Sequence, residues 1–171
     1  VLLKNENGAL PLRGTQNIAV VGALARKLRY QGSGSSHINP TRTVSFAQAM
    51  EAAGKPFAYA PGYRLEGDGY SKRLIEEAVR AAQGKDAVLA FIGLTDDYES
   101  EGFDRAHMRL PRAHDALVQA LCKANPNVIV VLAGGAPVVL GAWEKDARAI
   151  LNLYLGGQAG GEAAMDVLFG A

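Results

Sequence analysis

Short runs of consecutive apolar residues, separated by amphipathic stretches, constrain the fold of this chain more than any other feature. The main runs are residues 17–22 (NIAVVG), 86–93 (DAVLAFIG), 127–133 (NVIVVLA) and 149–155 (AILNLYL). Strands with one face in solvent alternate apolar and polar residues, whereas parallel strands covered on both faces are apolar throughout. The runs therefore predict buried parallel strands.

The stretches between these runs have helical spacing. Ser45 is a candidate N-cap for a helix over residues 45–53, in which apolar side chains recur every three or four residues, and Gly54 is its expected stop. Three more helices are expected at residues 71–82, 112–124 and 160–169, and a short strand at residues 57–60. The alternation predicts an α/β fold, a mostly parallel sheet sandwiched by helices on both faces, formed as a single domain by residues 1–171.

The loops that follow the strands are rich in glycine or in charge. In a parallel sheet such loops meet at one edge, where α/β proteins usually carry their functional residues. The loops in question are residues 23–40, 93–111, 134–141 and 156–161. We expect this edge to be the functional one.

Composition excludes several classes of function. The net charge is +1, which gives no electrostatic basis for binding nucleic acid or a membrane surface. The apolar runs are too short to span a bilayer. With a single cysteine and three scattered histidines, His37, His107 and His114, no metal site is assigned and no cofactor is expected. We expect His114 to lie on the polar side of its helix, in solvent.

The ends of the chain resemble cut ends. The sequence starts at Val1 rather than at a methionine and stops where the last predicted helix closes. We interpret it as part of a larger polypeptide.

Residues 98–111 (YESEGFDRAHMRLP) hold the densest set of ionisable groups in the chain, directly after a predicted strand. Glu99 and Glu101 lie two positions apart, and either could act as a general acid if its pKa were raised by a dry pocket or a neighbouring carboxylate. Asp104 and Arg105 are expected to form pairs or to fix the loop. The alternative is a solvated surface loop, against which the interleaved Tyr98, Phe103 and Met108 indicate a packed and ordered one.

A second polar loop, residues 32–36 (GSGSS), follows the first long strand at a distance of ten residues. Its glycine spacing matches neither the dinucleotide fingerprint nor the P-loop, so nucleotide binding is disfavoured. The alternative is a tight polar loop that meets a sugar or another domain. Ser35 and Ser36 of this loop, with Tyr98 of the charged loop, are the candidate substrate-binding residues.

In the order and spacing of its motifs, the whole chain resembles the C-terminal α/β sandwich domain of glycoside hydrolase family 3. This is a family of β-glucosidases and related exo-acting glycosidases. The motifs are residues 1–12 (VLLKNENGALPL), 32–36, 99–105 (ESEGFDR) with Leu110 and Pro111, 125–131 (NPNVIVV), 136–138 (APV), Trp143, 156–158 (GGQ) and 166–170 (DVLFG). One position departs from the pattern, because Ala159 stands where the family usually has glutamate after Gly-Gln.

The resemblance implies a retaining exo-acting β-glycosidase, with β-glucosidase as the expected activity and a β-glucoside or oligosaccharide as substrate. It implies an active site shared with an N-terminal barrel domain of the same polypeptide. The barrel supplies the nucleophile, and the sandwich domain supplies the general acid/base from its E-G-x-D-R motif. That role falls here on Glu101, with Glu99 as the second choice and Asp104 and Arg105 as local support. Without the barrel, the chain is expected to be inactive on its own.

Two alternatives stay open at this stage. One is a non-catalytic sandwich domain that braces a barrel or forms a homodimer. The other is a nucleotide-binding α/β domain, which the glycine spacing disfavours.

Overall fold

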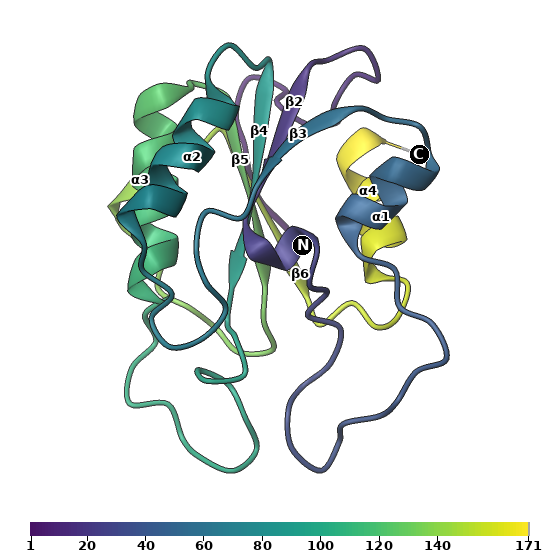
Figure 1. The fold of residues 1–171 in the computed structure, drawn as a ribbon, viewed down its shortest axis with the longest axis vertical. Helices are drawn as coiled ribbons and strands as arrows, with labels where there is room; N and C mark the ends of the chain where they lie inside the picture. Colours follow the sequence, from purple (N-terminus) through teal and green to yellow (C-terminus); the bar gives the residue numbers. More distant parts are fainter. Residues whose placement is uncertain (171) are drawn as a thin grey trace.

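Six strands form one sheet between two layers of helices in the computed structural model, which describes residues 1–170 (Figure 1). In chain order the elements are β1 (Leu2–Asn5), β2 (Ile18–Val21), η1 (Ala23–Ala25), α1 (Phe46–Ala52), β3 (Phe57–Ala60), α2 (Lys72–Ala82), β4 (Ala87–Gly93), α3 (Arg112–Ala124), β5 (Val128–Ala133), η2 (Ala142–Lys145), β6 (Ala149–Tyr154) and α4 (Gly160–Phe169). The expected α/β class is confirmed.

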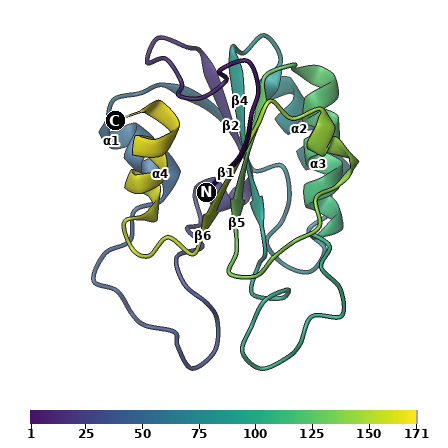
Figure 2. The same ribbon diagram turned by 180° about the vertical axis from the view of Figure 1, so that it is seen from behind.

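The sheet order is β1-β6-β5-β4-β2-β3, and every neighbouring pair except β1 with β6 is parallel. Helices α1 and α4 cover one face and α2 and α3 the other, as the two opposite views show (Figures 1 and 2). Both faces of β2 and β4 are therefore shielded from solvent, and all residues of these two strands are buried. This explains why their sequences are apolar without alternation.

Local signals set the element boundaries close to the predicted ones. Ser45 caps α1: its hydroxyl accepts from the Gln48 amide, and the Gln48 side chain accepts from the Ser45 amide. After α1, Gly54 adopts the left-handed conformation at φ +63° that commonly closes helices. Gly22, at φ +112°, ends β2 where a Cβ would overlap the carbonyl oxygen of Phe91. This close approach of β2 to β4 requires glycine.

Strand β1 was not among the predicted elements. It pairs antiparallel with β6 at the sheet edge, and three of its four residues are exposed. An edge strand with so little burial lacks the apolar pattern on which the other strands were predicted.

The expectation for His114 was wrong, because its side chain is only 1 % exposed. It lies at i, i+3, i+4 and i+7 spacing with Leu117, Val118 and Leu121, so it belongs to the buried face of α3. Its Nδ1 accepts a hydrogen bond from the Gly93 amide at 3.2 Å, and its ring packs against that of Tyr63 at an interplanar angle of 49°, with 4.0 Å between centroids. Burial lowers the pKa of His114 to about 3, so the imidazole is neutral and serves as a hydrogen-bond acceptor.

Candidate active site

Two long loops extend from the carboxyl ends of β2 and β4 at the same end of the sheet. They form the two large loops at the bottom of Figure 1, one purple to blue and one teal to green. The loop after β5 contacts the loop after β4, because the Val139 amide donates to the Met108 carbonyl at 2.8 Å, and the loops after β2 and β4 meet where the Glu101 amide donates to the Ser33 carbonyl at 3.4 Å. The polar residues singled out in residues 32–36 and 98–111 are thus brought together at one edge.

Glu101 lies at the tip of a tight turn on the loop after β4. An isolated antiparallel bridge between Ser100 and Phe103 closes the turn and leaves Glu101 and Gly102 as its two central residues. The Glu101 Oε1 accepts from the Ser35 hydroxyl at 2.8 Å, and Oε2 accepts from the Ser35 amide. These two hydrogen bonds lower the pKa of the Glu101 carboxyl, which is otherwise open to solvent.

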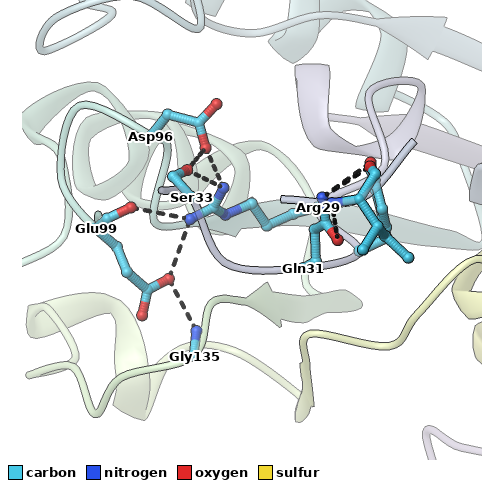
Figure 3. A network of polar contacts seen from close by, with 8 residues as sticks. Arg29, Gln31, Ser33, Asp96, Glu99 and Gly135 are labelled. Atoms are coloured by element: carbon cyan, nitrogen blue, oxygen red, sulfur yellow. Dashed lines mark hydrogen bonds and ion pairs between the residues drawn. The ribbon is translucent and has the colours of Figure 1, made fainter. Parts of the chain in front are cut away.

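Glu99 has a different environment, although it is only two residues away. Its side chain is 16 % exposed, and its Oε2 accepts from the Gly135 amide at 2.9 Å. The same oxygen lies 3.4 Å from Nη2 of Arg29, which also donates to the Glu99 carbonyl at 3.1 Å (Figure 3). The side-chain carboxylate and the backbone carbonyl of Glu99 therefore both contact groups within the domain.

Arg29 is the centre of this polar network. Its side chain is 9 % exposed, and its Nη1 pairs with Asp96 and contacts the Ser33 hydroxyl at 3.2 Å. Figure 3 shows the guanidinium lying between Asp96 and Ser33 on one side and Glu99 on the other. Through Glu99 and Gly135 the network ties together the loops after β2, β4 and β5. A planar guanidinium with five N–H donors suits such a junction.

The other residues expected to support the loop divide into two kinds. Arg105 connects parts of the loops, since its Nη1 donates to the Pro137 carbonyl at 3.0 Å and its Nη2 to the Arg109 carbonyl at 3.5 Å. Asp104 is exposed, and within residues 1–170 its side chain has no hydrogen-bond or ion-pair partner. Only the arginine of this pair acts as a support within the domain.

The expectation that three large side chains pack the loop holds for one of them. Tyr98 packs partly buried against the core, and burial, with Asp68 and Asp97 nearby, raises its pKa. Phe103 and Met108 are 48 % and 51 % exposed, so the prediction was wrong for both. The loop is ordered by the polar network and by Arg105 rather than by these two side chains.

Among the candidate substrate-binding residues, Ser35 is engaged by Glu101, whereas Ser36 is exposed beside it. Sequence reasoning missed Arg29 and Gly135 as site residues. The basic cluster of Arg26, Lys27 and Arg29 was a visible signal for the first. Gly135 takes part through its backbone amide, for which a sequence offers no signal.

Two features of the described residues bear on the class of site. Across residues 1–170, His, Cys, Asp and Glu side chains form no group of three or more that could hold a metal ion. Every helix in the same range falls short of the length and apolar character that a membrane span requires.

The fold and the edge loops define an α/β sandwich domain that carries a network of carboxylates and an arginine on the loops at the carboxyl edge of its sheet. The sequence profile of the glycosyl hydrolase family 3 C-terminal domain matches residues 1–171. The chain therefore belongs to glycoside hydrolase family 3 and corresponds to the C-terminal domain of its β-glucosidase-like enzymes.

Three relatives illustrate the similarity. Thermostable β-glucosidase B of Acetivibrio thermocellus is 48% identical over 99% of this chain and 23% of its own length. An exo-α-(1→6)-L-arabinopyranosidase of Bifidobacterium longum is 42% identical over 99% of this chain and 24% of its own length. The crystal structure of a family 3 β-glucosidase from Bifidobacterium adolescentis matches 99% of this chain and 25% of that chain, with a TM-score of 0.95 and 44% identity. The chain thus spans about a quarter of the length of these relatives.

Proposed function

We propose that this chain is the acid/base-bearing domain of a retaining exo-acting β-glycosidase, with β-glucosidase as the favoured activity. In this proposal a barrel domain of the same polypeptide supplies the nucleophile and most contacts to the sugar. Glu101 protonates the leaving oxygen and later activates the water. The observation that carries the proposal is the contrast between Glu101, exposed at the tip of its turn, and Glu99, engaged by Arg29 and Gly135.

A proton donor must reach a substrate that lies outside this domain. The Glu101 carboxyl is open to solvent and its two hydrogen bonds both come from one residue, Ser35. Glu99 would have to leave a nearly buried arginine before it could contact anything else. Moving Glu99 away would break its hydrogen bond with the Gly135 amide and would leave Asp96 as the remaining ion-pair partner of a nearly buried Arg29, which is costly. Glu101 is therefore the better candidate of the two.

The chemistry needs a second carboxylate. Retaining glycosidases place nucleophile and acid/base about 5–5.5 Å apart on opposite sides of the scissile bond. On this proposal the second carboxylate belongs to the barrel, and the 171-residue chain alone should show no hydrolysis of aryl glucosides.

The sugar is expected to be chosen outside this domain. The relatives at 48% and 42% identity are named for a glucoside and an arabinopyranoside, although both align over 99% of this chain. One sandwich domain is therefore compatible with different sugars, and the barrel is the proposed source of specificity.

The test compares Glu101→Gln and Glu99→Gln in the full-length enzyme. Glu101→Gln should lose turnover of cellobiose, whose leaving group needs a proton, while 2,4-dinitrophenyl glucoside still forms the glycosyl-enzyme. Azide should then attack the anomeric carbon of that intermediate, release the nucleophilic carboxylate and yield a β-glycosyl azide. Glu99→Gln is the matched control, and we expect weaker activity on both substrates with no glycosyl azide.

Two outcomes contradict the assignment. If Glu99→Gln alone loses cellobiose turnover and forms the azide adduct, Glu99 is the acid/base. If both variants keep full activity on cellobiose, the domain is a non-catalytic brace.

A further inference from the structure

Two neighbouring glycines in the loop after β2 have very different surroundings. A Cβ on Gly34 would lie 2.5 Å from Cβ and 2.6 Å from Oε2 of Glu101, and Gly34 has a φ of +100°. A Cβ on Gly32 would meet its nearest atom, the Ser36 hydroxyl, at 3.7 Å. Position 34 therefore needs glycine because Glu101 fills the space beside it, whereas position 32 has room for a side chain.

Ser35, the residue after Gly34, donates hydrogen bonds to both carboxyl oxygens of Glu101. The Ser35 amide donates to Oε2 and the Ser35 hydroxyl to Oε1, so each oxygen has one donor. The Glu101 amide in turn donates to the Ser33 carbonyl at 3.4 Å. Together these contacts fix the position of the turn and the rotation of the carboxyl plane.

We propose that Ser35, brought close by the missing side chain of Gly34, is a positioning residue that holds the Glu101 carboxyl in the orientation for proton transfer. This inference rests on the proposed role of Glu101 and assigns Ser35 to the acid/base instead of to the sugar. Ser35 acts through Glu101 and needs no contact with substrate.

Within residues 1–170, the Glu101 carboxyl accepts hydrogen bonds from Ser35 and from none of the charged side chains on the neighbouring loops. On the loop after β2, Arg29 is directed to Asp96 and Glu99, and His37 is exposed. The loop after β5 contributes no titratable side chain between residues 134 and 141. The remaining titratable groups on the loop of Glu101 itself are Asp97, Tyr98, Asp104, Arg105, His107 and Arg109.

The experiment measures kcat/KM of the full-length enzyme as a function of pH for wild type and Ser35→Ala. On cellobiose, at pH values where Glu101 is protonated in both proteins, we expect a loss of about three- to tenfold from poorer positioning. On 2,4-dinitrophenyl glucoside, whose departure needs no proton, the loss should be less than twofold.

The pH profile separates positioning from general damage. Hydrogen bonds from Ser35 lower the pKa of Glu101, so loss of the hydroxyl raises that pKa. Glycosylation uses the protonated carboxyl, so the basic limb of kcat/KM should move to higher pH in Ser35→Ala. The ratio of variant to wild type on cellobiose should therefore rise with pH across that limb. A purely structural role would lower activity by the same factor at every pH and on both substrates, which would overturn the proposal.

Matched variants are available in the same loop. Thr41→Ala removes an exposed hydroxyl farther along the same loop and should leave both profiles unchanged. Ser35→Thr should restore the wild-type limb. Gly34→Ala should lose at least as much cellobiose activity as Ser35→Ala, whereas Gly32→Ala should lose less than twofold. Equal effects of the two glycine substitutions would contradict the inference.

Failure of this inference differs from failure of the proposed function. If Glu101→Gln is inactive on cellobiose and forms the azide adduct, but Ser35→Ala behaves as wild type, only the role of Ser35 is wrong. If Glu101→Gln is fully active on cellobiose, the role of Glu101 is wrong and that of Ser35 falls with it.

Discussion

His114, buried behind the edge of the sheet that carries the candidate site, gives a prediction whose magnitude follows from the structure. His114 is 1 % exposed, accepts a hydrogen bond from the Gly93 amide on Nδ1 and packs its ring against that of Tyr63. Gly93 is the last residue of β4, directly before the loop that carries Glu101. Protonation of His114 would place a charge in the core and remove the acceptor for that amide.

The sign and magnitude follow from proton linkage. Burial lowers the pKa of His114 from 6.5 to about 3, so the unfolded chain binds a proton that the folded chain does not between these pH values. Full stability is present above pH 6.5 and is lost progressively as pH falls towards 3, at about 1.4 kcal/mol per pH unit. From pH 7.5 to pH 5 the cost in the free energy of unfolding is about 2 kcal/mol.

The assay is urea unfolding of the 171-residue chain at pH 7.5, 6 and 5, for wild type and His114→Gln. The glutamine carbonyl can still accept from Gly93, but loss of the ring packing should make the variant about 1–2 kcal/mol less stable at pH 7.5. Because the other titrating groups are common to both proteins, the stability difference should shift by about 2 kcal/mol in favour of the variant at pH 5, so that the gap closes or reverses. His107→Gln, a change of an exposed histidine, controls for the loss of one imidazole and should follow wild type. A gap that stays constant from pH 7.5 to pH 5 would refute the reasoning.

Further predictions concern other named contacts. Gly22→Ala should destabilise the fold by more than about 3 kcal/mol, seen as loss of soluble protein, because its Cβ overlaps a β4 carbonyl at positive φ; normal yield and unfolding would contradict this. Ser45→Ala should cost about 1 kcal/mol in urea unfolding through loss of the α1 capping box, and an unchanged midpoint would argue against it. Arg29→Lys should speed limited proteolysis within residues 93–111, because a lysine ammonium cannot contact both Ser33 and Glu99 as the guanidinium does. An unchanged cleavage rate would count against the network. In an NMR titration of the 171-residue chain, Glu101 should have a pKa below the usual glutamate range, and a raised value would contradict the Ser35 contacts.

The fold could be predicted from the sequence where burial alone determines the pattern. Strands β2, β4 and β5 are covered on both faces, so nearly every residue is apolar and the parallel arrangement follows. Strand β1 escaped prediction because it is held by pairing with β6 rather than by burial. The prediction for His114 was wrong because it followed the polar residue type. The helical spacing of His114 with Leu117, Val118 and Leu121 places it on the apolar face of α3.

The candidate site could be predicted only as a region. Glu99 and Glu101 are the same residue type two positions apart, and their own residue pattern offers no basis for separating them. The preference for Glu101 came from the resemblance to the E-G-x-D-R motif of family 3. The difference comes from partners distant in sequence, since Arg29 is 70 residues and Gly135 36 residues from Glu99. Loops after three different strands meet at one edge, so the tertiary fold determines which glutamate is bound within the domain and which is left exposed.

If the proposed function holds, the same contacts define what the barrel domain would have to contribute. A general acid at neutral pH needs a raised pKa, whereas Ser35 lowers the pKa of an exposed Glu101. Within the domain, the Ser35 hydrogen bonds therefore have two opposed effects on Glu101. They orient its carboxyl group for proton transfer, but they also favour the charged form, which cannot donate a proton. Burial by a facing domain, or the negative charge of a nucleophilic carboxylate close by, would raise the pKa without removing those bonds. On the proposed function, this domain supplies the geometry of the acid/base, and the barrel domain supplies the environment that makes it an acid.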